Sequence, residues 1–135
     1  MPNRAAKSPP SSSRGCRTLV VEDDALTHTT LRRVIERSGH ECESVGTMAE
    51  AYPRLRSFGC LVLDLQLPDG SGIELLRYVR ERQLPLRVAV HTGCSDRTVL
   101  NEVRALRPDA LFMKPFDPAR LVAWLHAARD SAQAK

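Results

Sequence analysis

Five polar residues each stand at the end of a short apolar run: Glu22, Asp23, Asp64, Thr92 and Lys114. Three of them are acidic, and two carboxylates about 4 Å apart repel each other by roughly 4 kcal/mol at an effective dielectric constant of about 20. Three carboxylates in one place therefore need a cation or a raised pKa. Lys114 supplies part of that positive charge, and Mg²⁺, a hard cation with oxygen ligands, is the metal that fits best.

A carboxylate beside a metal, an ammonium and a hydroxyl is suited to attack on a phosphoryl group, because charge on the transferring oxygens must be stabilised from several sides. Asp64 is the candidate nucleophile and would form an aspartyl-phosphate. Composition singles out Lys114, since the chain has 17 arginines and three lysines, and the other two lysines are Lys7 and Lys135. Because arginine is the usual basic residue of this chain, the single internal lysine indicates a position that requires the compact charge of an ammonium group.

The elements that must position these residues alternate along the chain from Thr18 onward. Short apolar, β-branched runs predict strands at 19–21, 42–45, 60–63, 88–90 and 111–113, each followed by a segment of helical spacing. Five strands alternating with five helices predict a single α/β domain with a parallel sheet covered on both faces. The carboxyl ends of parallel strands lie at one edge, so this fold brings the five polar residues together.

Local signals mark where the helices begin and end. Asp24 is a predicted N-cap, Gly39 ends the first helix, and the second helix is expected either to tolerate Pro53 or to kink there. A fourth helix is expected from about Ser95 to Leu106. The remaining start signals are the capping boxes Thr47-x-x-Glu50 and Ser71-x-x-Glu74 and the pair Asp117-Pro118.

The net charge of +4 belongs to the first residues of the chain. Four of the 20 basic residues and none of the 16 acidic ones fall in the first eighteen positions, so the remainder is neutral. We predict a disordered basic tail at 1–16, a folded domain at 17–131 and a C-terminal tail at 132–135. The folded domain therefore has no charge surplus for nucleic-acid binding.

Neither a signal peptide nor a membrane-spanning run is present in the sequence, which predicts a cytoplasmic protein without membrane contact. The four cysteines lack Cys-x-x-Cys spacing and are interpreted as free thiols in a reducing compartment. Arg77, Arg80 and Arg82 alternate with acids, which is typical of a solvated helix face.

The motifs resemble those of the response regulator receiver domain of two-component signalling. They are Val20-Val21-Glu22-Asp23-Asp24, the segment from Leu61 to Gly72, Thr92-Gly93 and Lys114-Pro115-Phe116, and the resemblance extends from about Thr18 to Ala128. It implies a flavodoxin-like (βα)5 fold with strand order 2-1-3-4-5.

The resemblance also implies roles for the site residues. Asp64 would accept a phosphoryl group from the phosphohistidine of a histidine kinase or phosphotransfer protein. Asp23, Asp64 and the backbone carbonyl of Gln66 would bind Mg²⁺, and Glu22 would hold metal-bound water. Lys114 would contact a phosphate oxygen.

The implied output is a conformational switch. The Thr92 hydroxyl would turn toward the phosphoryl group and shift the face built from the fourth helix, fifth strand and fifth helix, where a downstream protein or a second phosphorylated copy would bind. Such a protein is a signalling domain and not an enzyme that turns over a separate substrate.

The sequence departs from the family at the aromatic switch position on the fifth strand, where it has Leu111. Phe112 is adjacent but is expected to point to the opposite face. Cys94, two residues after Thr92, occupies a position that in the family tunes dephosphorylation. His91 is interpreted as a packing residue and His28 as a solvent-facing one.

Two other functions remain open from the sequence. A pseudo-receiver would bind partners without phosphorylation, although all five site positions are filled. An aspartyl-phosphate phosphatase would share the nucleophile but carries a second Asp two residues later, where this chain has Gln66.

Overall fold

The computed structural model describes residues 17–133, so the tail predicted at 1–16 and the last two residues lie outside the described part. The final helix ends at Gln133 and overlaps the predicted C-terminal segment. None of the helices within residues 17–133 is long and apolar enough to cross a membrane.

A five-stranded parallel sheet forms the centre of the fold, in the order β2-β1-β3-β6-β7. This order confirms the predicted 2-1-3-4-5 arrangement, because β6 and β7 are the fourth and fifth strands of this sheet. The strand bounds are Arg17–Val21 for β1, Glu41–Val45 for β2, Cys60–Asp64 for β3, Arg87–Thr92 for β6 and Ala110–Met113 for β7.

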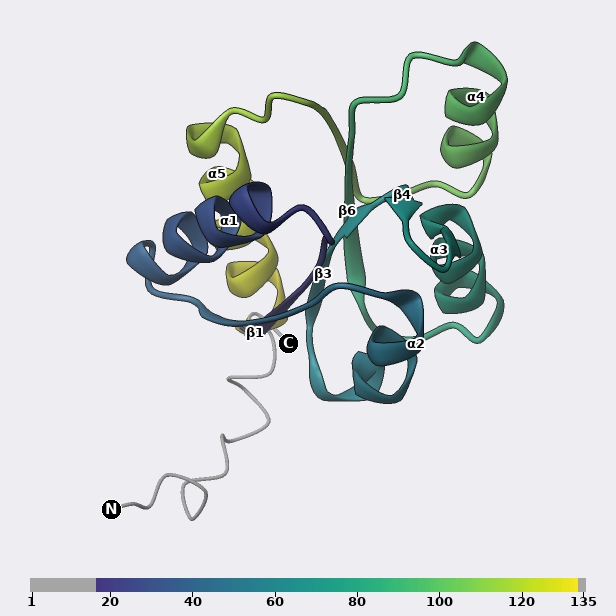
Figure 1. The fold of residues 1–135 in the computed structure, drawn as a ribbon. Coiled ribbons are helices and arrows are strands. Elements are labelled where there is room, and N and C mark those ends of the chain that lie inside the picture. The colour runs from purple at the N-terminus through teal and green to yellow at the C-terminus, as the bar shows by residue number, and fades with distance from the viewer. Residues whose placement is uncertain (1–16, 134–135) are drawn as a thin grey trace.

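Helices cover both faces of the sheet, as predicted. Figure 1 shows α1 (Ala25–Arg37) and α5 (Pro118–Gln133) together on one face. The opposite face carries α2 (Met48–Ala51), α3 (Gly72–Glu81) and α4 (Arg97–Ala105). Each connection from one strand of the parallel sheet to the next along the chain therefore contains a helix.

The core divides into two layers because successive side chains of a strand point to opposite faces. On β3, Leu61 and Leu63 pack toward α2, α3 and α4, whereas Cys60 and Val62 pack toward α1 and α5. Every residue of β3 is buried, as the continuous apolar run predicts for a strand covered on both sides.

The predicted helix signals act as expected. Asp24 Oδ2 accepts a hydrogen bond from Thr27 N at 2.9 Å and caps α1. In the capping box, Glu50 N donates to Thr47 Oγ1 at 3.1 Å. Helix α2 ends at Ala51 and continues as a 3₁₀ helix over Tyr52–Ser57, which contains Pro53. Proline has no N–H for the α-helical bond, so the regular α-helix does not continue through Pro53.

A small hairpin after β3 was not predicted beyond the turn at its tip. Its two strands, β4 (Gln66–Leu67) and β5 (Gly70–Ser71), pair antiparallel. Gly70 at the tip has a φ of +145°, and a Cβ there would lie 2.7 Å from Met48 Cε of α2. The backbone conformation therefore disfavours a side chain at position 70, and a Cβ there would also require the flexible end of Met48 to move.

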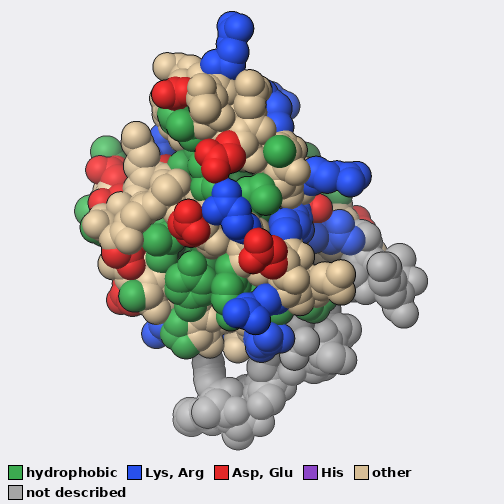
Figure 2. Space-filling view, turned by 90° about the vertical axis from the view of Figure 1, so that its right-hand side faces the viewer, with side chains coloured by type: hydrophobic (Ala, Val, Ile, Leu, Met, Phe, Trp, Pro, Cys, Tyr) green, Lys and Arg blue, Asp and Glu red, His purple; other side chains and the backbone are tan. Residues whose placement is uncertain are grey.

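Two arginines of α3 attach α4 to the rest of the domain. Arg77 Nη2 lies 3.1 Å from Glu102 Oε2, and Arg80 donates to the carbonyl oxygens of Leu106 and Arg107 at 3.1 and 2.7 Å. Figure 2 shows acidic and basic side chains interspersed over this face. The prediction of a solvated face is confirmed for Arg82, which is exposed, but is wrong for Arg80, because its head satisfies carbonyl groups at the end of α4.

Candidate functional site

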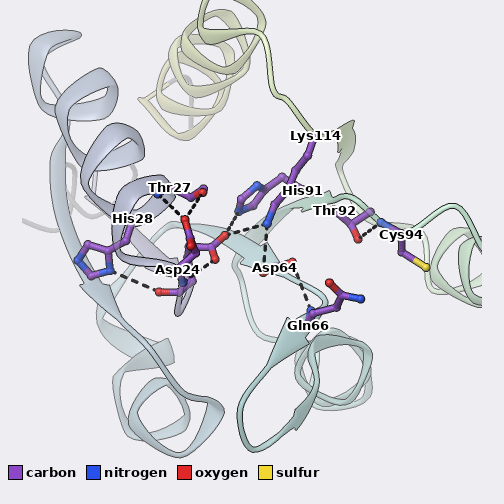
Figure 3. Close-up of polar contacts among 10 residues, drawn as sticks. Asp24, Thr27, His28, Asp64, Gln66, His91, Thr92, Cys94 and Lys114 are labelled. Atoms are coloured by element: carbon purple, nitrogen blue, oxygen red, sulfur yellow. Dashed lines mark hydrogen bonds and ion pairs between the residues drawn. The ribbon is translucent and has the colours of Figure 1, made fainter.

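A cleft of about 460 Å³ opens at the carboxyl edge of the sheet, next to the ends of β1 and β3. Its lining includes Glu22, Asp23, Asp64, Gln66 and Lys114. Figure 3 shows Asp64 and Lys114 pointing toward each other across this edge. The fold therefore brings together all the predicted metal and phosphate residues except Thr92, which is not part of the cleft wall.

Glu22 is fully buried and held by several partners. Its Oε2 accepts a hydrogen bond from Asp24 N at 3.0 Å, and its Oε1 lies 3.3 Å from Lys114 Nζ. Burial alone would raise the pKa of Glu22, but the contact with His91, the Asp24 N–H and the charge of Lys114 outweigh it and lower the pKa from 4.5 to about 2. Glu22 is consequently ionised at neutral pH.

Asp64 ends β3 and is only 3% exposed. Its Oδ1 accepts a hydrogen bond from Gln66 N at 3.3 Å, and its Oδ2 lies 3.3 Å from Lys114 Nζ. Burial raises the pKa of Asp64, and the negative charge of Glu22 raises it further, against the smaller opposing effects of Gln66 N–H and Lys114. The carboxylate is therefore destabilised in a way that a bound cation would relieve.

Lys114 is positioned by the strand pairing of β6 and β7. Its backbone N donates to Thr92 O at 2.8 Å, and the peptide bond to Pro115 is cis. Burial lowers the pKa of Lys114, but the charges of Asp64 and Glu22 outweigh this effect and raise it overall. The ammonium group is thus a fixed positive charge between two buried carboxylates.

Three carboxylates are close enough to share one cation. Oxygen atoms of Glu22, Asp23 and Asp64 lie within 4.8 Å of one another, and Asp23 is exposed to the cleft side. An all-oxygen donor set with an open side fits Mg²⁺, which keeps several waters and takes few protein ligands. Gln66 lies in the same cleft wall, so the predicted donor residues are all present at one place.

Thr92 ends β6 and is fully buried. Its Oγ1 accepts a hydrogen bond from Cys94 N at 3.0 Å, so the hydroxyl oxygen is engaged with the loop after β6 and not with Asp64 (Figure 3). Gly93 leaves the neighbouring space open, since a Cβ there would meet only the Lys114 side chain, at 3.8 Å.

His91 belongs to the site although sequence reasoning assigned it to packing. The side chain is 1% exposed, its Nε2 lies 3.2 Å from Glu22 Oε1, and neither ring nitrogen makes a hydrogen bond of ordinary geometry. The ring also meets Phe116 edge to face at 6.4 Å between centroids. A histidine directly after the apolar run Val88-Ala89-Val90 was the available signal, and its partner Glu22 directly follows β1, far away in sequence.

His28 is also placed differently from the prediction. It is half-buried on α1, with Nε2 2.7 Å from Ser44 Oγ and Nδ1 3.4 Å from Glu22 O. The interpretation as a solvent-facing residue is therefore wrong, because His28 links α1 to β2 beside the site.

Leu111 and Phe112 on β7 point to opposite faces of the sheet, as predicted for the switch position that lacks the family's aromatic residue. Leu111 is partly buried in the layer that contains Val99 and Leu106, whereas Phe112 belongs to the opposite layer. The aromatic side chain of this strand therefore lies on the face of α1 and α5, and a leucine faces α4.

The comparisons with known proteins agree with this geometry. The chain belongs to the response regulator receiver domain family, whose model matches residues 18–126. Receiver domains are signalling domains, and this family generally binds Mg²⁺, in keeping with the acidic cluster described above.

Among curated relatives, the chain is 31% identical over 117 residues to the transcriptional regulatory protein FixJ of Bradyrhizobium diazoefficiens, a match that covers 84% of this chain and 57% of FixJ. It is 27% identical over 113 residues to the cell cycle transcriptional regulator CtrA of Caulobacter vibrioides, covering 82% of this chain and 49% of CtrA. The chain thus spans about half the length of these relatives.

Solved structures show the same fold. A CheY-like response regulator receiver domain protein from Methanospirillum hungatei matches with a TM-score of 0.79 and 25% identity, covering 87% of this chain and 96% of that one. A sensor protein from Polaromonas sp. matches with a TM-score of 0.75 and 27% identity, covering 86% and 97%.

Proposed function

We propose that this domain is phosphorylated on Asp64 by the phosphohistidine of a sensor histidine kinase or a phosphotransfer protein. The observation that supports it best is the setting of Asp64, whose buried carboxylate lies 3.3 Å from Lys114 Nζ and within 4.8 Å of two further carboxylates. Such a carboxylate gains stability when a bound cation offsets the negative charge of its neighbours.

In the proposed reaction, an Asp64 oxygen attacks the phosphorus of the phosphohistidine. The new O–P bond forms as the P–N bond breaks, and the released imidazole nitrogen keeps the electron pair and takes up a proton. Asp23, Asp64 and the Gln66 carbonyl would hold Mg²⁺, with Glu22 binding its water, and the metal would neutralise charge on the phosphoryl oxygens. Lys114 contributes a fixed positive charge on the opposite side.

The proposed output uses the hydroxyl of Thr92, which now accepts a bond from Cys94 N. A phosphoryl group on Asp64 would offer this hydroxyl a strong acceptor and favour the conformation in which Thr92 faces it. The affected surface is built from α4, β7 and α5, and a downstream protein or a second phosphorylated copy would bind there. Leu111 takes the place of the family's aromatic switch on this surface.

A cytoplasmic location is part of the same proposal. In the described part of the chain, Cys42 and Cys94 are free cysteines, which suits a reducing compartment. Burial raises the pKa of the Cys42 thiol to about 12, so this side chain is an unreactive packing group.

The test is incubation with a small phosphodonor, with Mg²⁺ or with EDTA, followed by intact-mass analysis. We expect the mass of one phosphoryl group to be added only with Mg²⁺, and to be lost in Asp64→Ala. Asp96→Ala is the matched control, since Asp96 caps α4 outside the cleft. A wild-type chain that gains no mass would instead be a pseudo-receiver, and steady hydrolysis of an added phosphomonoester would indicate a phosphatase.

A further inference from the structure

Asp69 lies at the turn between β4 and β5 and binds a helix twenty residues earlier in the chain. Its Oδ1 accepts a hydrogen bond from Met48 N at 2.9 Å, and its Oδ2 accepts one from Ala49 N at 3.0 Å. Both donors belong to the first turn of α2, whose N–H groups have no partners within the helix. These two hydrogen bonds are the main reason why the pKa of Asp69 is lowered.

Helix α2 has its own local cap, so Asp69 is an addition to it. Thr47 Oγ1 accepts from Glu50 N at 3.1 Å, and Glu50 Oε1 accepts from Gly46 N at 3.1 Å. Asp69 therefore satisfies the two remaining amides of the first turn from another part of the chain. The contact joins the hairpin to α2 at two atoms of one carboxylate, which fixes orientation as well as distance.

Packing strengthens the same junction. Met48 is buried, and its Cε lies 2.7 Å from the position that a Cβ of Gly70 would take, so the hairpin tip packs against this side chain. The polar contact through Asp69 and the apolar contact through Met48 lie on consecutive residues of the hairpin, Asp69 and Gly70. The tip is thus held against α2 and not free to move as a surface loop.

The other end of the hairpin carries the site. Gln66 N donates to Asp64 Oδ1 at 3.3 Å, and Gln66 pairs with Ser71 across the hairpin. Gly72 N donates to Leu65 O at 2.7 Å, and a Cβ at Gly72 would collide with Asp64 O. The hairpin is therefore the frame that sets where the Gln66 carbonyl and the Asp64 carboxylate point.

We propose that Asp69 is a positioning residue for the Mg²⁺ and phosphorylation site, acting through the hairpin on Gln66 and Asp64. This inference rests on the proposed function, because it assigns a part to Asp69 in that same site. Asp69 itself does not line the cleft, although its chain neighbour Pro68 does, and it contacts no reacting atom. Its effect comes from holding the tip of a four-residue ladder whose base supplies the predicted carbonyl ligand and orients Asp64.

If Asp69 were only a structural cap, its removal would affect α2 alone. Thr47→Ala is the control variant, because Thr47 caps α2 and nothing else. This substitution removes a capping bond from the same helix without touching the hairpin. Asp69→Ala removes the contact with the hairpin as well. Asp69→Asn keeps one acceptor oxygen but places an amide N–H₂ against the second helix N–H, so it retains one of the two bonds.

The experiment measures Mg²⁺ affinity from the stabilisation of the full chain against urea as Mg²⁺ is titrated. We expect Asp69→Ala to raise the dissociation constant about tenfold, as loss of an outer-shell partner does at metal sites. Asp69→Asn should raise it by a smaller factor, and Thr47→Ala should lower the urea midpoint without changing the Mg²⁺ affinity. Equal affinity in Asp69→Ala and wild type, or equal losses in Asp69→Ala and Thr47→Ala, overturns the proposal.

Amide hydrogen exchange in EDTA tests the positioning step without any metal. The amides of Gln66 and Gly72 should exchange faster in Asp69→Ala than in wild type or Thr47→Ala. Unchanged exchange at both amides refutes the role of Asp69. If wild type neither binds Mg²⁺ nor accepts phosphate, the proposed function fails, while the exchange rates still decide whether Asp69 holds the hairpin.

Discussion

Replacing Asp64 by Asn should make the metal-free domain more stable, although it removes the proposed phosphate acceptor. The side chain lies within 4.8 Å of the Glu22 and Asp23 carboxylates and 3.3 Å from Lys114 Nζ. At an effective dielectric constant of about 20, each repulsion is roughly 3.5 kcal/mol and the attraction is about 5 kcal/mol. The net repulsion relieved is therefore about 2 kcal/mol.

Two further effects modify this value in opposite directions. Exposure of Asp23 screens its share of the repulsion, whereas burial of Asp64 adds a desolvation penalty that the amide avoids. The raised pKa of Asp64 gives the same sign, because it means that the folded state favours the neutral form. A gain of about 2 kcal/mol corresponds to a rise of roughly 8 °C in Tm for a domain of this size.

The assay is thermal and urea denaturation of wild type and Asp64→Asn, in EDTA and in saturating Mg²⁺. Ligand binding at about one hundred times the dissociation constant stabilises a protein by about 2.7 kcal/mol, so Mg²⁺ should reverse the order of the two stabilities. Asp96→Asn is the control, since Asn and Asp are equivalent N-caps and Asp96 lies on α4. The electrostatic reasoning is refuted if Asp64→Asn is no more stable than wild type in EDTA.

Three other predictions concern the same site. Metal-free wild type should gain stability as the pH falls through the folded-state pKa of Asp64, because that pKa is raised. Below about pH 4.5 it should lose stability, because the folded-state pKa of Glu22 is lowered to about 2. Urea midpoints measured across this pH range in EDTA show whether a stability maximum exists. Lys114→Met should lower the free energy of unfolding by about 3 kcal/mol in EDTA, because it leaves two buried carboxylates without their ammonium partner. Urea denaturation should show that Mg²⁺ restores most of this loss. An unchanged urea midpoint in EDTA would contradict the ion-pair assignment. Gly72→Ala should destabilise by about 2 kcal/mol through its collision with backbone of Asp64, whereas Gly46→Ala, with a nearest contact of 3.9 Å, should leave Tm nearly unchanged; similar Tm values for both would argue against the close approach.

The strands of the sheet were predictable because their signals are local or repeat along the chain, whereas the strand order followed from the family resemblance. The apolar run before Asp64 marks a strand buried on both faces, and Asp24, Thr47 and Pro53 mark helix ends by chemistry within three or four residues. Placing the carboxylates and Lys114 together needed only the rule that parallel strands end at one edge.

The features that could not be predicted all depend on partners distant in sequence. His91 meets Glu22, Arg80 meets the end of α4, and Asp69 meets the start of α2. Each is a polar side chain whose sequence neighbours indicate no specific role, and a single sequence does not show which distant residue it contacts. The hairpin was missed because two strands of two residues each have no detectable periodicity.

Strand β7 is the edge of the sheet, with β6 as its neighbour there. It places two consecutive side chains on opposite sides, with Leu111 under α4 and Phe112 among the residues of α1 and α5. Because these two side chains belong to different helical layers, any displacement of β7 would change the packing on both faces of the domain.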